Sequence, residues 1–528
     1  MLAETAPAHT QVPLPRRACW VCGGLLGLLV LLAAIAVAWT SSSGIGLRSD
    51  SAVYVAAARN LVDGKGLSWI SGGGEIRPMT LHAPLLPMLL AGAEALGASA
   101  IPVARVLNAI CLGLDVLLVG GLAFMLTGSG WLAVLATLVM AGTGEMYRVH
   151  TWLMSEPLFI VLMLAGAVAL LQYRSARRMA FLILASAAFG LAALTRYGGL
   201  ALPVAGVVFL VLDPAATRRR RLGESATMLV LGLGPTVIWM VRNYVLTGQT
   251  GGRSFGMHLD LWPSLRDQAV AIVLNWFAPL RLVEWIMAGP EVSAILVSLA
   301  GLALVILGFF LLTKEARRAM ASSVLLSGVV LLGACLLSYL AVTFFAALFS
   351  TPGADIDERV LSPVYPLLWL VLVTGLGWVW SHGRLVGRLA VGLLLILLVR
   401  NKLVYTYWTL RELSADGLGY SSRAWQTSDT IENAIALDPA VIYTNDTAAI
   451  YLLADRPSYV VPWALPEYDP AAAEQAEAKL IDALFVQHGA VVLFGAQDLP
   501  AGWSPERWRI DAQGQDGVIL SPVAASAQ

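Results

Sequence analysis

The sequence has few charged residues. Only 13% of its 528 residues are Asp, Glu, Lys or Arg, about half of the roughly 25% that is usual in soluble proteins. Basic and acidic residues number 34 each, so the chain also has no basic excess. So little polar surface excludes a soluble globular enzyme, a disordered chain and a nucleic-acid-binding protein. With 58% hydrophobic residues, the composition predicts a polytopic membrane protein.

Cysteine is also scarce. The chain has four, Cys19, Cys22, Cys111 and Cys335, all in apolar stretches. The first two form a CxxC pair, but no second pair or histidine cluster accompanies it, which argues against a zinc site. No disulfide framework is indicated, and we interpret the four as small buried hydrophobic residues.

Long apolar runs predict an α-helical bundle of about eleven transmembrane helices. A span needs about 20 apolar residues. The predicted spans are 18–47, 103–126, 131–147, 157–172, 179–195, 198–212, 226–241, 291–312, 321–347, 361–380 and 387–401. Two further apolar stretches, 83–98 and 269–289, are predicted to lie along the outer membrane surface as juxtamembrane helices.

The basic clusters predict the orientation. If the N-terminus is cytoplasmic, every cluster between the spans falls on the cytoplasmic side, as the positive-inside rule requires. These clusters are Arg16 and Arg17; Arg174, Arg177 and Arg178; Arg218 to Arg221; Lys314, Arg317 and Arg318; and Arg384 and Arg388. An odd number of spans then places the C-terminus outside. We expect a multi-pass protein of a bacterial inner membrane, with a large first outer loop at 41–102.

The composition changes near residue 403. Charged residues return, and strand-like runs at 440–443, 458–462, 490–494 and 517–520 alternate with helical segments. We therefore predict a membrane domain at 1–402 and a small extracytoplasmic α/β domain at 403–528.

Two acids begin helices on the predicted outer side. Asp50 opens a helix on which Tyr54 shares its face, and Glu156 precedes Pro157 at the start of the fourth span. Each acid can be a normal helix-start residue. Alternatively, a carboxylate held at the membrane surface can act as a general base. Two acids that reach one outer cavity fit acid/base chemistry better than two independent caps.

Arginines recur at the same level. Several guanidinium groups at one mouth of a bundle indicate an anion site, because each binds phosphate and stays charged. The candidates are Arg105, Arg196, Arg242 and Arg359. His82 in the first loop is a further candidate for substrate contact, whereas Asp115, inside the second span, is expected to make a structural contact within the bundle.

These residues together resemble the GT-C superfamily of integral-membrane glycosyltransferases. The pattern is similar to protein O-mannosyltransferases, lipid A aminoarabinose transferases and rhizobial lipopolysaccharide sugar transferases, over roughly residues 18–400. The motifs are Ser49-Asp50-Ser51, Gly64-Lys65-Gly66, His82-Ala83-Pro84-Leu85, Arg105-Val106-Leu107, Ser155-Glu156-Pro157-Leu158, Thr195-Arg196-Tyr197, Arg242-Asn243 and Arg359-Val360-Leu361-Ser362-Pro363.

The resemblance implies a polyprenyl-phosphate-sugar donor and transfer to an extracytoplasmic hydroxyl of a glycan, lipid or protein, with inversion. It implies that Asp50 is the catalytic base and that Glu156 occupies the place of a second acid, often Asp in that superfamily. Tyr54, His82 and the four arginines would bind substrate. The segment at His82 lacks the double proline or acid–lysine pair of some branches, which leaves the substrate class open.

Two rival interpretations remain. A membrane transporter or flippase of a lipid-linked or small anionic substrate is favoured only by Asp115. A non-catalytic assembly or receptor protein would not depend on Asp50. Five acids could furnish oxygen ligands to a divalent cation: Asp50, Glu156, Asp355, Asp357 and Glu358. Their spacing in the sequence does not favour a metal site, and we expect no required metal or cofactor.

Overall fold

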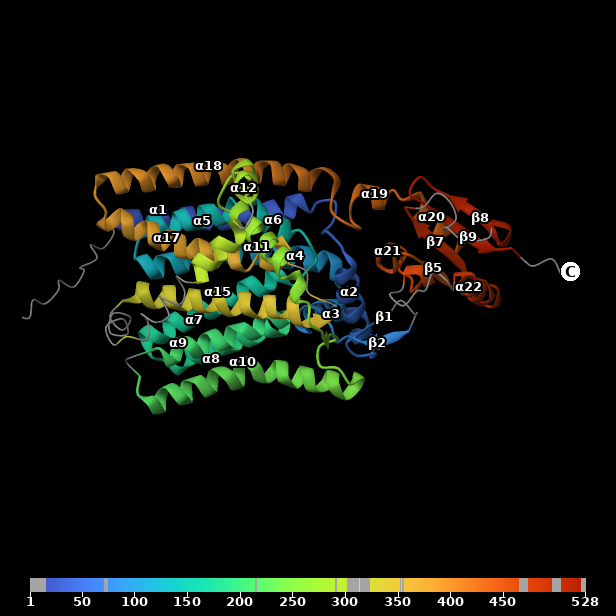
Figure 1. Ribbon diagram of the computed structural model, residues 1–528, viewed down its shortest axis with the longest axis horizontal. Helices are drawn as coiled ribbons and strands as arrows, with labels where there is room; N and C mark the ends of the chain where they lie inside the picture. Colours follow the sequence, from blue (N-terminus) through green and yellow to red (C-terminus); the bar gives the residue numbers. More distant parts are fainter. Residues whose placement is uncertain are drawn as a thin grey trace, which may run out of the picture.

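The computed structural model describes residues 16–70, 75–213, 216–289, 292–301, 313, 323–351, 353, 356–464, 473–495 and 505–523. Most of the described chain is helical (Figure 1). Six helices in this part of the chain are long and apolar enough to cross a membrane, or up to eight spans if two bent helix pairs each count as one. The chain is therefore a multi-pass α-helical protein.

The six long helices form the body of the bundle. They are α1 (Arg16–Thr40), α4 (Ala100–Thr127), α7 (Glu156–Ala176), α10 (Arg218–Thr247), α15 (Val324–Phe349) and α18 (Leu385–Asp416). Between them lie the shorter apolar helices α8 (Met179–Thr195), α9 (Ala201–Val211) and α17 (Val364–His382). Because α8 and α9 have only 17 and 11 residues, the count of eleven spans stays a prediction.

The predicted span 131–147 is bent. It consists of α5 (Gly130–Ala141) and α6 (Gly144–His150), which meet at 58°. Thr143, at the bend, shares a hydrogen bond of 2.7 Å with Tyr365 of α17. The bend also brings Glu145 within 2.6 Å of the Lys402 ammonium of α18. Residues 131–147 therefore form a bent helix pair that makes polar contacts with α17 and α18, and not one straight span.

The first predicted span is shorter than expected. α1 ends at Thr40, and Ile45 to Leu47 continue as extended chain that pairs with two distant segments. Gly46 bridges to Trp152, and Leu47 bridges to Gly419. These contacts bring the first loop, the start of α7 and the C-terminal residues together at one end of the bundle.

The first loop is built from α2 (Ser49–Val62), a hairpin of β1 (Ser68–Ile70) and β2 (Ile76–Pro78), and α3 (Leu85–Ala95). All four elements lie at one end of the bundle (Figure 1). We call this the loop end. α10 begins at the opposite end, and α7 finishes there, where Arg177 forms an ion pair of 2.6 Å with Asp213. The described basic clusters at 174–178 and 218–221 are thus remote from the loop end.

Shorter elements complete the fold. They are β3 (Ser254–Phe255), which pairs with β4 (Ser350–Thr351), then α11 (Trp262–Asn275), α12 (Leu280–Met287) and α16 (Glu358–Leu361). α11 carries few charges and ends beside Trp276, which packs edge-on against Tyr365 with ring centroids 5.5 Å apart.

The C-terminal residues form a mixed five-stranded sheet in the order β6-β5-β7-β9-β8. The strands are β5 (Ile442–Thr444), β6 (Tyr459–Val460), β7 (Ala490–Phe494), β8 (Trp508–Gln513) and β9 (Gly517–Pro522). Neighbouring residues of β7 face opposite sides, as strand geometry requires. Val491 packs beneath α22 (Ala473–Gln487), and Val492 packs against α20 (Asp429–Leu437).

This sheet domain lies beyond the loop end (Figure 1). α18 runs without a break past residue 402 to Asp416 and leads into the domain. Arg59 of α2 forms an ion pair with Asp455, next to α21 (Thr447–Leu453), with 2.5 Å between the Arg59 Nη1 and Asp455 Oδ1 atoms. The domain therefore sits against the first loop rather than apart from it.

Candidate functional site

The start of α2 is fixed by Ser51 rather than by Asp50. The Ser51 hydroxyl accepts a hydrogen bond of 2.9 Å from the Arg48 backbone N–H and donates one of 2.9 Å to the Leu153 carbonyl. Asp50 makes no side-chain cap contact. The structure therefore does not support the interpretation of Asp50 as a helix cap. The Asp50 carboxylate instead faces other side chains.

The Asp50 carboxylate contacts two cationic or polar partners. Its Oδ1 atom lies 3.3 Å from His82 Nε2, and its Oδ2 atom lies 3.2 Å from Arg359 Nη1. Tyr54 packs edge-on against the His82 ring, with centroids 5.1 Å apart. These residues come from α2, the first loop and α16, so the contact joins segments more than 300 positions apart in the chain.

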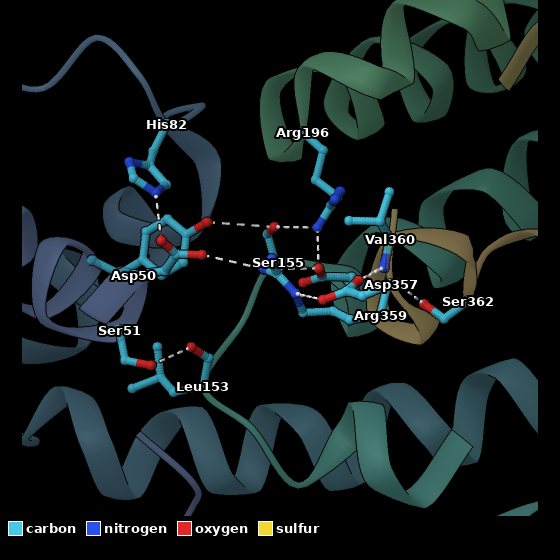
Figure 2. A network of polar contacts seen from close by, with 12 residues as sticks. Asp50, Ser51, His82, Leu153, Ser155, Arg196, Asp357, Arg359, Val360 and Ser362 are labelled. Atoms are coloured by element: carbon cyan, nitrogen blue, oxygen red, sulfur yellow. Dashed lines mark hydrogen bonds and ion pairs between the residues drawn. The ribbon is translucent and has the colours of Figure 1, made fainter. Parts of the chain in front are cut away.

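Glu156 is the second acid at the same place. Its side chain is fully buried, and its Oε1 atom pairs with Arg196 and lies 3.3 Å from Arg359 Nη1. One Arg359 nitrogen is thus shared between the two predicted acids. Figure 2 shows the side chains of Asp50, Arg196 and Arg359 pointing toward one another.

Hydroxyl groups connect the remaining members. Arg196 Nη1 donates a hydrogen bond of 3.3 Å to Ser155 Oγ, and the Tyr54 hydroxyl lies 3.5 Å from the same atom. Asp357 caps α16 by accepting a 2.7 Å bond from the Val360 N–H, and its other oxygen lies 3.5 Å from Arg359 Nε (Figure 2). The structure therefore brings Asp50, Tyr54, His82, Glu156, Arg196 and Arg359 into one cluster.

The charges in this cluster keep Asp50 ionised. Burial alone would raise the pKa of the Asp50 carboxyl, but the His82 hydrogen bond and the charges of His82, Arg359 and Arg196 lower the pKa to about 2. Burial lowers the pKa of Arg359, but the nearby carboxylates of Glu156, Asp357 and Asp50 together raise that pKa above its usual value. Both groups are therefore charged at neutral pH.

This low pKa predicts an acid limb of stability. The unfolded pKa of Asp50 is near 3.8 and the folded pKa is about 2, so its stabilising contribution is complete above about pH 4 and is lost as the pH falls toward 2. We expect the unfolding temperature of the wild type to fall more steeply in that window than that of Asp50→Asn. Thermal unfolding of both proteins in detergent at a series of pH values measures this, and parallel curves throughout would contradict it.

Two cavities meet at the Asp50–Arg359 pair. The first, of about 640 Å³, is lined by Asp50 and His82 together with Trp69 of the hairpin and Tyr451 of the C-terminal domain. The second, of about 350 Å³, is lined by Arg359. Since the two side chains are 3.2 Å apart, the ion pair lies between two spaces that could hold two substrates.

Arg242 is not in the cluster. It donates hydrogen bonds of 3.2 Å to the Met79 carbonyl and 3.1 Å to the Leu67 carbonyl, and it stacks over the Trp239 ring at 4.5 Å. Arg242 therefore holds the backbone on both sides of the β1–β2 hairpin. Its predicted contact with substrate has no counterpart in this geometry.

Arg105 also lies apart from the cluster. It donates to the Ala38 carbonyl and to the Ser41 hydroxyl at 3.1 Å. The last carbonyls of a helix have no partner within it, and cationic side chains commonly satisfy them. Arg105 therefore ends α1, and the expectation that it binds substrate does not match its position.

Replacing Arg105 with glutamine is expected to lower stability but to leave any activity that depends on the Asp50–Arg359 pair close to that of the wild type. The variant loses its charged hydrogen bonds to the end of α1, each worth about 1–3 kcal/mol. Activity per folded molecule and thermal unfolding measure the two effects, with Arg359→Gln as the comparison expected to lose activity. A large drop in rate without loss of folded Arg105→Gln protein would contradict this placement.

Two pairs of buried ionisable residues lie outside the cluster, and the second pair was not predicted from the sequence. Asp115 lies 3.1 Å from His150, with both side chains fully buried, so the expected contact within the bundle is confirmed. Glu145 and Lys402 form a second buried pair beside the smaller cavity. The one sequence signal for Glu145 is its position close to Arg148 in the predicted second outer loop. Nothing in the sequence indicates that Glu145 pairs with a lysine 257 positions away.

No group of three or more His, Cys, Asp or Glu side chains within the described residues could hold a metal ion. Asp357 caps α16, and Asp355 lies outside the described residues. The expectation that no metal is required stays a prediction.

Comparison with known proteins finds similarity in structure only. No family model and no curated protein sequence matches the chain. ArnT from Cupriavidus metallidurans in the apo state superimposes over 97% of this chain and 99% of its own, with 16% identity and a TM-score of 0.50. The Archaeoglobus fulgidus oligosaccharyltransferase, solved with Zn and sulfate, matches over 88% of this chain and 68% of its own, with 13% identity and a TM-score of 0.52. The chain has the GT-C fold.

The resemblance drawn from the sequence is therefore confirmed at the level of the fold. ArnT bound to undecaprenyl phosphate is also similar, with 16% identity and a TM-score of 0.49 over 95% of this chain and 98% of that one. At these identities the GT-C fold does not by itself assign a substrate, and the roles of individual residues depend on the geometry described above.

Proposed function

We propose that this GT-C protein is a glycosyltransferase that moves a sugar from a polyprenyl-phosphate donor to an extracytoplasmic hydroxyl of a glycan, lipid or protein. The observation that carries the proposal is the shared contact of Arg359 with Asp50 and Glu156 between two cavities. A carboxylate and a guanidinium at one point supply a base for the acceptor and a counter-charge for a leaving phosphate.

In the proposed reaction, Asp50 accepts the proton of the acceptor hydroxyl in the larger cavity. The hydroxyl oxygen attacks the anomeric carbon from the side opposite the phosphate, and the bond between that carbon and the phosphate oxygen breaks, which inverts the configuration. Arg359 and Arg196 stabilise the negative charge that develops on the polyprenyl phosphate. The proton leaves Asp50 to solvent when the products depart.

Donor binding is expected to make Asp50 a better base. A carboxyl with a pKa of about 2 has little tendency to take up a proton at neutral pH. A phosphate that binds Arg359 competes for the guanidinium and adds negative charge nearby, and both effects raise the pKa of Asp50. The base is then activated only when the donor is in place.

The proposed location is the bacterial inner membrane, with the site at the outer face. The described basic clusters lie at the end of the bundle opposite α2 and α3, which supports this orientation. A membrane transporter remains the second candidate. Asp115, the residue that favoured it, is paired with His150 and lines neither cavity.

A reconstituted assay tests the proposal. Purified full-length protein in proteoliposomes is given decaprenyl phosphates that bear radiolabelled sugars, together with a cell-envelope extract as the source of acceptor. A glycosyltransferase moves label from the organic-soluble donor into the acceptor fraction with inversion at the anomeric carbon. Movement of intact donor across the bilayer without new product would instead favour a flippase.

A further inference from the structure

The smaller cavity contains buried polar atoms without partners. Glu145 is 6% exposed, and its Oε1 atom bonds to Lys402 at 2.6 Å, but its Oε2 atom has no hydrogen-bond partner among the described residues. The Trp276 Nε1–H donor is likewise buried and unpaired within that part of the chain. Both residues line the same cavity of about 350 Å³. Because buried polar groups are normally hydrogen-bonded, the two atoms indicate a ligand that donates to one and accepts from the other.

The other lining residues narrow the chemistry of that ligand. Trp152 and Trp276 supply aromatic surface, and Glu358 adds a carboxylate for which no hydrogen bond or ion pair is found in the described chain. Two of the lining arginines are already engaged. Arg48 stacks over Trp152 at 4.1 Å, and Arg148 holds Glu412 through two contacts of 3.2 and 2.6 Å. A hydroxyl or ammonium group in the cavity can donate to the unpaired oxygens of Glu145 and Glu358, whereas a carboxylate placed beside these two oxygens would be repelled.

The size and position of the cavity match one sugar ring. Ligand pockets span about 300–1,000 Å³, so this one is at the small end and suits a monosaccharide rather than an oligosaccharide. Arg359 lines the same cavity and contacts Asp50 on its other side. A phosphate on Arg359 would therefore place the attached ring in this cavity and leave the larger one for the acceptor.

We infer that this cavity binds the sugar ring of the lipid-linked donor, and that Glu145 and Trp276 select a neutral or amino sugar over a uronic acid. The inference rests on the proposed function. It assigns specificity to two residues that lie outside the acid–arginine cluster.

Binding to the purified full-length protein tests the inference. The probes are decaprenyl methyl phosphate, which carries one negative charge and no sugar, and decaprenyl phosphates that bear mannose, arabinose, 4-amino-4-deoxyarabinose or galacturonic acid. At least one neutral or amino sugar is expected to bind more tightly than the methyl ester, and the galacturonic acid donor is expected not to. Trp276→Phe keeps an aromatic ring against Tyr365 but removes the N–H donor. It should weaken binding of the preferred donor by about tenfold and leave the methyl ester unchanged.

Trp285→Phe is the matched control, because Trp285 is 76% exposed on the neighbouring helix α12 and lines neither cavity. If Trp276→Phe does not fold, the double variant Glu145→Gln/Lys402→Met, which removes both charges of the buried pair, is tested in the same way.

Equal affinity for all probes, preference for galacturonic acid, or an unchanged sugar preference in the folded variant would overturn the inference while the proposed transferase stands. Failure of the wild type to bind any probe, the methyl ester included, would count against the lipid-phosphate donor itself.

Discussion

Replacing Asp50 with asparagine is expected to lower the rate of sugar transfer by about 10²- to 10⁴-fold, the contribution of a positioned general base. Asparagine has nearly the same shape and can still hydrogen-bond to His82 and Arg359, but it cannot accept the proton of the acceptor hydroxyl. Initial rates of label transfer in proteoliposomes measure the effect. Donor binding is measured alongside, and it is expected to persist.

Asp63→Asn is the matched control for this substitution. Asp63 follows the last turn of the same helix α2, its side chain is 55% exposed, and its contact is Lys65 at 2.9 Å. Its variant should transfer sugar at the wild-type rate. If Asp50→Asn keeps more than about one tenth of the wild-type rate while it binds donor normally, Asp50 is not the base.

Replacing Glu156 with glutamine is expected to have the largest effect on stability, about 3–5 kcal/mol in the free energy of unfolding, the usual cost of breaking a buried ion pair. Glu156 is fully buried, and it is the acid that offsets Arg196 and also contacts Arg359. Glutamine leaves two guanidinium groups close together with less compensating charge. Equilibrium unfolding in mixed detergent micelles measures the change.

Glu412→Gln provides the comparison for a solvent-exposed pair. Its side chain is 60% exposed, and it holds Arg148 at 2.6 Å. Exposed pairs contribute about 0–1 kcal/mol, so this variant should be nearly as stable as the wild type. Equal unfolding free energies for the two glutamine variants would mean that Glu156 does not balance the arginines as described.

Sequence patterns predicted the helical membrane fold because hydrophobic runs and positive-inside charge are local properties of the chain. The helices α4, α7 and α15 lie on predicted spans, and β5, β7 and β9 lie on predicted strand-like runs. The bend between α5 and α6 was missed, because it depends on Thr143 and Glu145 finding Tyr365 and Lys402 on other helices.

Part of the candidate site could also be predicted, because helix starts are local features of the sequence. Asp50 and Glu156 could be selected because each acid begins a helix on the predicted outer side. Nothing local distinguishes Arg359, which reaches both acids, from Arg105, which ends α1. Trp276 could not be selected, because its unpaired N–H becomes visible only when the surrounding helices are in place.

The most direct test of the account is mass spectrometry of the cell-envelope glycans, lipids and glycoproteins of a strain that lacks this protein, complemented by the wild type or by Asp50→Asn. The account predicts one sugar-modified species that is absent from the deletion strain, restored by the wild type and still absent with Asp50→Asn at equal protein level. An unchanged envelope in the deletion strain, or full restoration by Asp50→Asn, would contradict it.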